Sequence, residues 1–315
     1  MNLWHQLIGS LPFAWAQFAF MRTALLAVLI VSPLFAVIGT LVVNNRMAFF
    51  SDAIGHASLT GIGLGVLLGM ADPLVSLVAF ALFLGLGIIV LQRATHAAMD
   101  TVISLSMSCS IALGVVLLSR GGNFNKFSHY LVGDLLSITP GEIGQLALTS
   151  LFVGGGLLLG YNRILLIGLN ESLARSRGLS VWWTQLLFCT AVVMVVTMNL
   201  SWVGILIINA MLIVPAAGAR NIAANARQYL FYAIGIGLFS GVAGLIASYY
   251  ANTATGASIV LVAMGCYLAT LGIKAIRAAL AAERTSRATA RVSGHQRLAR
   301  RRLPVPTGNG SGGDG

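Results

Sequence analysis

Long apolar segments separated by short polar connections run along most of this chain. A helix needs about 20 apolar residues to cross the hydrocarbon core of a bilayer, and on that criterion the pattern predicts nine membrane-spanning helices. They lie near residues 22–43, 47–70, 73–92, 101–119, 144–162, 181–199, 202–219, 229–250 and 256–273. The predicted fold class is therefore all-α, a polytopic transmembrane helical bundle of about nine spans, within a range of eight to ten.

Composition supports the same class. The chain is 57% hydrophobic and 9% charged, with a mean hydropathy of +0.89, which leaves too little polar surface for a soluble domain of 315 residues. We expect three parts: an extracytoplasmic or interfacial segment at 1–21, a transmembrane domain at 22–275, and a basic cytoplasmic tail at 276–315. The tail is predicted to be disordered, because its composition buries too little apolar surface to fold alone.

The basic residues predict the orientation in the membrane. If the loops 44–46, 93–100, 163–180 and 220–228 and the C-terminus face the cytoplasm, 16 of the 19 basic residues lie inside. This places the N-terminus outside and the C-terminus in the cytoplasm, for a multi-pass protein of the cytoplasmic (inner) membrane. The net charge of +11 then reflects orientation and contact with membrane lipid, and nucleic acid is not an expected partner.

One predicted span carries two ionisable residues. Asp52 and His56 are the only ionisable residues between Met47 and Met70. An Asp at membrane depth costs roughly 2.5–3.5 kcal/mol on insertion scales, so such residues mark substrate paths or interior pairs. Positions i and i+4 share a helix face, so both side chains can contact one divalent metal ion. Thr60 lies one turn later on the same face and is a candidate for the transport pathway. The alternative is that they pair with each other or with the backbone.

Small and polar residues add detail in two spans. Glycines repeat at four-residue spacing from Gly61 to Gly69, which favours close helix packing. Asn209 and Pro215 interrupt the apolar span at 202–219, and the proline removes a backbone donor and kinks the helix. Both are candidates for the transport pathway, Asn209 the better one, with plain packing as the alternative.

The segment RMAFFSDAIGHA, Arg46–Ala57, resembles the second-helix signature of the membrane permeases of ABC importers for zinc, manganese and iron, the ABC-3 family. Three further stretches are similar to that family's outer-loop element, proline-kinked helix and last span. They are Tyr130–Pro140, Val203–Ala217 and Thr255–Val262. The resemblance covers residues from about 18 to 275 in order, and it is specific for the family and much less so for the metal.

The resemblance implies a permease subunit that moves a divalent transition metal into the cytoplasm, zinc first and manganese or iron next. It also implies a homodimer or a pair of similar permeases, two cytoplasmic ATPase subunits and an extracytoplasmic metal-binding protein. The metal is cargo, and no permanently bound cofactor is expected. A phosphate-binding loop needs a Gly-Lys pair, but Lys126 and Lys274 follow Asn125 and Ile273, so this chain is not expected to be an ATPase.

The inside segment 170–180 reads as a short capped helix. Asn170 can cap its start, Glu171 suits the positive end of the helix, and Gly178 can end it in the left-handed conformation. The segment is similar to the coupling element with which ABC permeases contact their ATPase. Glu171, Ala174 and Gly178 are therefore assigned to ATPase coupling, with an ordinary cytoplasmic turn as the alternative.

The 120–143 connection is the predicted outer loop, and its middle forms either a surface helix or a partial re-entry. Gly133 and Asp134 are candidates for docking the binding protein or for a structural role. Glu142 and His129 lie nearby and could receive metal or contact the binding protein, although a solvated loop suits His129 better.

The ligand types leave the metal open. In a twofold dimer, two Asp52 and two His56 could form an O2N2 site acceptable to zinc. The fourth span, however, carries serines and a cysteine from Ser104 to Ser110, where zinc members of the family often have a histidine.

Two other classes of protein compete with this interpretation. A secondary transporter driven by an ion gradient would show inverted repeats and more intramembrane carboxylates. An intramembrane metalloprotease would need a paired-histidine motif such as HExxH, which the sequence lacks.

Overall fold

The computed structural model describes residues 4, 8, 12–70, 73–121 and 135–301, and every regular element among them is helical. Eight of these helices are long and apolar enough to cross a membrane. They comprise residues Ala19–Asn44, Leu74–Thr95, Met99–Ser119, Pro140–Leu169, Val181–Val203, Ile205–Ile222, Ala226–Ala251 and Thr255–Ala281. The prediction of a polytopic helical membrane protein is confirmed.

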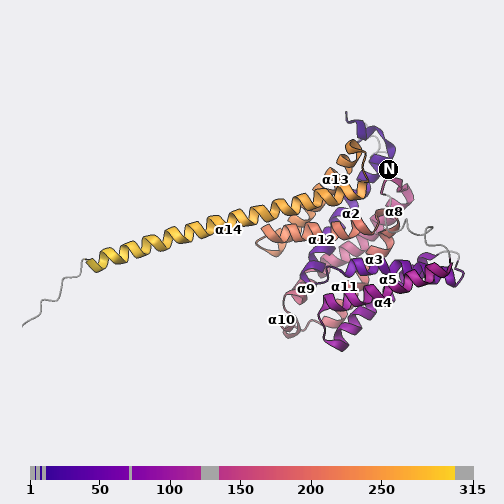
Figure 1. Cartoon of the computed structure of the whole chain (residues 1–315), viewed down its shortest axis with the longest axis horizontal. Helices are drawn as coiled ribbons and strands as arrows, with labels where there is room; N and C mark the ends of the chain where they lie inside the picture. The colour runs from indigo at the N-terminus through magenta and orange to yellow at the C-terminus, as the bar shows by residue number, and fades with distance from the viewer. Residues whose placement is uncertain (1–3, 5–7, 9–11, 71–72, 122–134, 302–315) are drawn as a thin grey trace, which may run out of the picture. The chain divides into compact units, whose positions relative to one another are not determined.

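Figure 1 shows the elements in chain order. They are η1 (Ala14–Gln17), α2 (Ala19–Asn44), α3 (Phe50–Leu67), α4 (Pro73–Thr95), α5 (Met99–Gly121), η2 (Leu135–Ser137), α8 (Pro140–Thr149), the π-helical turn η3 (Ser150–Gly154), α9 (Gly155–Leu169), α10 (Glu171–Ser176), α11 (Val181–Val203), α12 (Ile205–Ile222), α13 (Ala226–Ala251) and α14 (Thr255–Arg301).

Of the nine predicted spans, the second one, 47–70, corresponds to α3 and does not appear among the eight candidates. Its Asp, His, Ser, Thr and Gly residues lower its hydropathy, although it forms a regular helix of 18 residues. Gly69, with φ +67°, follows its C-terminal end in the left-handed region that glycine adopts without strain.

The predicted span at 144–162 is longer in the structure. It begins at Pro140 and continues through α8, η3 and α9 to Leu169. Thr139 and Glu142 form a reciprocal capping box at its start, and Pro140 suits the first helical position. The π-helical turn at Ser150–Gly154 lies within the span, where sequence periodicity gave no indication of it.

The chain divides into two compact units, Met1–Thr270 and Leu271–Gly315. The helix α14 belongs to both, since it continues to Arg301, whereas the sequence analysis predicts a disordered tail from residue 276. Alanine and arginine are frequent in this stretch and both are strong helix formers, which accounts for the helical conformation. Residues 302–315 lie outside the described residues.

The helix α2 is the centre of the first unit. It packs against α9, α12 and α13, and Phe35, Ile38 and Leu41 on it have no exposed surface. A second group consists of α3, α4 and α5, which run side by side in Figure 1, with α3 in contact with both of the others. Both groups meet along α12, which packs against α2 and α3.

Small residues bring these helices into backbone contact. At Gly39 of α2, an added Cβ would overlap the backbone carbonyl oxygen of Leu212 in α12. At Gly61 of α3, an added Cβ would lie 2.6 Å from the Cα atom of Leu77 in α4, which confirms the packing role predicted for that glycine. The close approach of α2 to α12 and of α3 to α4 therefore requires glycine at these two positions.

Replacing Gly39 by alanine should destabilise the protein by about 1–3 kcal/mol, because the new methyl group meets a backbone atom that cannot move aside alone. Gly87→Ala is the matched control, since Gly87 lies within α4 with open space around it and alanine favours the helix. The measurement is the unfolding midpoint of the purified protein in detergent. Equal midpoints for the two variants would contradict the close contact of α2 with α12.

Candidate functional site

The N-terminal part of α3 places Asp52 and His56 on one helix face, as their spacing predicts. The Nε2 atom of His56 lies 3.5 Å from the Oδ1 atom of Asp52. The side chains are 28% exposed for Asp52 and 31% for His56, so both are half-buried and still accessible. A distance of 3.5 Å is within the range of an ion pair but long for a hydrogen bond.

A third polar side chain reaches the pair from another helix. Asn209 of α12 donates from its Nδ2 atom to Oδ1 of Asp52 at 2.5 Å. The approach of the two helices is close, because Gly55 of α3 lies against the side chain of Ile205 in α12. The structure thus joins Asp52, His56 and Asn209, which the sequence analysis names separately as metal ligands and pathway candidate.

Two buried oxygen atoms, one on α12 and one on α3, lack hydrogen-bond partners. The Oδ1 atom of Asn209 and the Oγ atom of Ser51 are both buried, and no hydrogen bond within the described part of the chain reaches them. Buried polar atoms without partners are costly and often mark a place that a ligand completes. Asp52, His56 and Asn209 therefore offer a carboxylate oxygen, an imidazole nitrogen and an amide oxygen to a cation.

No larger ligand cluster forms within the described residues: nowhere do three or more His, Cys, Asp or Glu side chains converge. One chain thus presents two ionisable ligands and one amide, fewer than the four that structural zinc sites use. A complete coordination shell requires water, further neutral oxygen atoms or a second chain.

The structure does not bring the other two pathway candidates to the pair. Thr60 is completely buried between α3 and α5, where its hydroxyl donates to the backbone carbonyl of Ser110 at 2.5 Å. Pro215 is buried within α12 and packs near Gly237 of α13. Both residues are thus engaged in helix packing in the structure, which for Pro215 agrees with the alternative named in the sequence analysis.

The short helix α10 has the caps that the sequence predicts. The side chain of Asn170 accepts a hydrogen bond from the backbone N–H of Leu173 at 3.0 Å, and Gly178 is left-handed with φ +74°. Glu171 pairs with Arg175 at 2.5 Å, and both side chains are more than half exposed. The ion pair therefore lies on the exposed surface of α10, together with Ser172, Leu173 and Ser176.

Ala174 has a different place from the one predicted. It has no exposed surface and packs with Ile167 of α9 and Val181 of α11. It therefore holds α10 against the membrane-spanning helices, and an incoming partner cannot contact it directly.

The outer-loop candidates separate into two groups. Gly133, Asp134 and His129 lie outside the described residues. Glu142 lies in the capping box of α8, where its Oε2 atom accepts from the backbone N–H of Thr139 at 2.6 Å and from the Thr139 hydroxyl at 2.8 Å. Its carboxylate is engaged in the cap of α8, a role that the sequence Thr-Pro-Gly-Glu indicates and that the sequence analysis overlooked.

Sequence reasoning missed one contact near α10. The guanidinium group of Arg93, at the end of α4, lies 4.3 Å from the ring centroid of Trp182 at the start of α11. This cation–π contact joins the two helices next to α10. The adjacent Trp182 and Trp183 are a signal for it, because tryptophan concentrates at membrane interfaces.

Comparison with known proteins finds the same family that the sequence resembles. The sequence model of the ABC 3 transport family matches residues 17–274. The chain is 28% identical over 246 residues to the high-affinity zinc uptake system membrane protein ZnuB of Haemophilus influenzae, covering 78% of this chain and 94% of that protein. It is 29% identical to the manganese transport system membrane protein MntC of Listeria monocytogenes, covering 78% and 88%.

An iron transport system membrane protein of Haemophilus influenzae, named as probable, is 31% identical, with 83% of this chain and 96% of that protein covered. Among solved structures, PsaBC from Streptococcus pneumoniae in complex with Fab superposes with a TM-score of 0.69 at 26% identity. The match covers 86% of this chain and 95% of that chain.

The bond between Asn209 and Asp52 should appear as an energetic coupling of about 1–3 kcal/mol in a double-mutant cycle, because the amide stabilises a half-buried carboxylate. The cycle uses Asn209→Ala, Asp52→Ala and the double variant, with unfolding in detergent as the measurement. The control cycle pairs Asn209→Ala with Asp100→Ala, whose effects should add, because Asp100 lies exposed in the first turn of α5. Additive effects in both cycles would contradict the contact.

Proposed function

The chain belongs to the ABC 3 transport family, and on this basis we propose that it moves a divalent transition metal into the cytoplasm, zinc first and manganese or iron next. It is a multi-pass membrane protein and the permease subunit of a metal-uptake ABC transporter. It is a transport component and is not itself an ATPase.

The convergence of Asp52, His56 and Asn209 is the observation that carries the proposal. A cation between these side chains gains the carboxylate of Asp52 and the imidazole of His56 directly. The Asn209 amide can turn its unpartnered Oδ1 atom toward the cation, because the amide group has a donor side and an acceptor side. The hydrogen bond from Asn209 to Asp52 is then replaced by a metal–oxygen contact.

A second permease completes the site in this proposal. Two copies of the Asp52–His56 pair facing each other across a twofold axis give two oxygen and two nitrogen ligands, a set that suits tetrahedral zinc. The half-buried state of both side chains leaves surface through which a second chain and a metal can approach. A homodimer or a pair of similar permeases meets this requirement equally.

The order of metals follows from the ligands. Carboxylate, amide and imidazole groups bind zinc, manganese and iron alike, and affinity order alone does not select among them. Relatives named for each of these metals match this chain at 28–31% identity. Zinc comes first because two oxygen and two nitrogen ligands suit it. The fourth span offers no additional imidazole, since it has serines and a cysteine where zinc members of the family often have a histidine, and Ser110 among them lies within hydrogen-bond distance of Thr60.

The proposed partners follow from the family, and one lies on each side of the membrane. A cytoplasmic ATPase subunit docks on the exposed Glu171–Arg175 surface of α10 in this proposal, and the C-terminus faces the cytoplasm. An extracytoplasmic metal-binding protein delivers the cargo at the opposite side, with Gly133 and Asp134 as candidate docking residues. No resident cofactor takes part, since the metal is the substrate.

Asp52→Asn and His56→Ala should each abolish metal uptake while the protein stays folded, because they remove a ligand and leave the packing of α3 intact. The assay uses proteoliposomes that contain the permease, its ATPase subunit and ATP, with zinc and manganese offered separately. Asp100→Asn and His96→Ala are the matched controls, since they remove the same groups from exposed positions at the start of α5 and just before it.

Two outcomes would contradict the proposal. Wild-type uptake by both site variants would return Asp52 and His56 to a structural role. Uptake by vesicles that lack the ATPase subunit, driven by a proton or sodium gradient, would favour a secondary transporter instead.

Gly178→Val should weaken ATPase association and uptake at least tenfold, because a β-branched residue resists the left-handed conformation that ends α10. Gly178→Asn should retain most of both, since asparagine tolerates that conformation. Co-purification of the ATPase subunit on tagged permease measures association. If the valine variant binds ATPase and transports normally, α10 is not the coupling element.

A further inference from the structure

A groove of about 420 Å³ lies between the helices α9 and α11. Its base consists of the buried side chains of Leu157, Ile164 and Phe188. Gly156 lines it without any neighbouring atom in the space where a side chain would lie. Because both helices belong to membrane-spanning segments, the groove opens at membrane depth.

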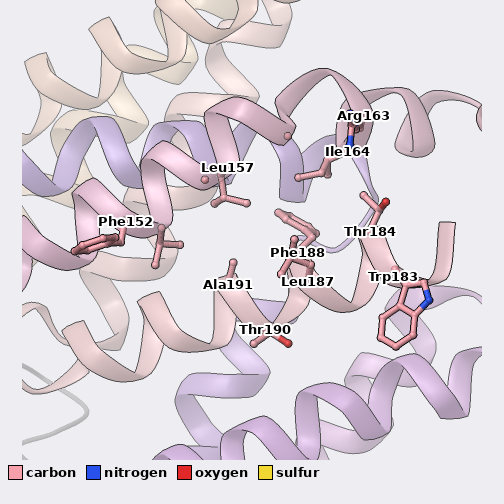
Figure 2. Close-up of a pocket in the computed structure, with 13 residues that line it drawn as sticks. Phe152, Leu157, Arg163, Ile164, Trp183, Thr184, Leu187, Phe188, Thr190 and Ala191 are labelled. Carbon is pink, nitrogen blue, oxygen red and sulfur yellow. The ribbon is translucent and has the colours of Figure 1, made fainter. Parts of the chain in front are cut away.

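The rim of the groove is apolar and strongly exposed. Phe152 is 73% exposed, Leu187 is 73% exposed and Trp183 is 69% exposed. Figure 2 shows Phe152 near one end and Trp183 near the other, with Leu157 and Leu187 between them. Apolar side chains around an elongated hollow suit a hydrocarbon chain.

One end of the groove carries a positive charge. Arg163 lies there beside Thr184, at the same end as Trp183 (Figure 2). Arg163 is exposed, and none of the ion pairs among the described residues includes it. An arginine at the edge of a membrane-spanning segment favours an anionic partner, and its planar guanidinium group matches phosphate geometry.

We propose that this groove binds an anionic phospholipid, with an acyl chain between α9 and α11 and the headgroup phosphate on the guanidinium group of Arg163. Trp183 lies at the same end, where an indole ring sits at the level of lipid headgroups. Basic pockets between membrane helices on the cytoplasmic side are typical sites for anionic headgroups. The helix α9 leads directly into α10, so the lipid braces the segment that carries the exposed Glu171–Arg175 surface.

Charge favours lipid over a second copy of this chain. A second copy would have to place an acidic group on Arg163, and the described carboxylates of Asp52, Glu142 and Glu171 are engaged with Asn209, Thr139 and Arg175. Of the described carboxylates this leaves the exposed Asp100, which lies at the start of α5 and brings no hydrocarbon chain for the groove. An anionic phospholipid has both the hydrocarbon chain and the negative charge in one molecule. The inference is independent of which metal is transported.

The test is native mass spectrometry of the full-length protein in detergent with equal amounts of phosphatidylglycerol and phosphatidylethanolamine. Arg163→Gln should lower the preference for phosphatidylglycerol roughly tenfold, which corresponds to the loss of one charge-assisted hydrogen bond. Arg227→Gln is the control, because it removes the same charge from an exposed position at the start of α13 that does not line the groove.

A second pair of variants tests the apolar part. Gly156→Leu should remove bound lipid of both kinds, because its side chain fills the groove without a clash, and leucine favours the helix. Gly155→Leu should retain the lipid, because its neighbouring space is equally open but it does not line the groove.

Three results would overturn the proposal. Equal loss of lipid in the Gly155 and Gly156 variants would indicate unspecific annular lipid. An unchanged lipid preference in Arg163→Gln would remove the headgroup contact. A Gly156→Leu protein that loses its dimer and keeps its lipid would make the groove an interface between two copies of this chain. Metal and ATPase are absent from the assay, so failure here is separate from failure of the transport function.

Discussion

A carboxylate among membrane-spanning helices needs a donor, and the bond from Asn209 to Asp52 provides it. Water cannot fully solvate a half-buried carboxylate at this depth, so the protein must offer its own hydrogen bond. The donor comes from α12, so the requirement also joins α12 to α3. The relative position of these two helices therefore decides whether His56 and Asn209 can contact the same cation as Asp52.

Close packing around α3 keeps that position defined. Gly61 allows backbone contact with α4, and Gly114 of α5 lies against Thr60, whose hydroxyl bonds across to Ser110. On the other side, Gly39 lets α2 approach the backbone of α12. Larger residues at these positions would separate the helices by more than a hydrogen bond can span. The polar site thus depends on packing contacts between helices whose residues do not themselves belong to the site.

The helix α10 is fixed by its own caps and by one buried contact with its neighbours. Asn170 and Gly178 set the beginning and end of α10, whereas buried Ala174 sets its contact with α9 and α11. The groove with Arg163 lies on the same α9 helix, a few residues before the cap. A displacement of α9 would therefore reach α10 directly.

The sequence by itself determined most of the features that depend on neighbours within about one helical turn. The membrane-spanning segments, the shared face of Asp52 and His56, the Asn170 cap and the left-handed Gly178 all follow from composition or from spacings of one to four residues. The π-helical turn and the engagement of Glu142 in a cap are also local, but their signals are weak or were overlooked.

Only the tertiary structure decided the contacts between distant segments. Asn209 and Asp52 are 157 residues apart, and no periodicity predicts that the amide donates to that carboxylate. Thr60 shares a face with Asp52 in a helix projection, yet its hydroxyl bonds to α5, because the neighbouring helix approaches on that side. Ala174 likewise received its role from the helices packed around it, since burial is a property of the assembled fold and not of the local chain.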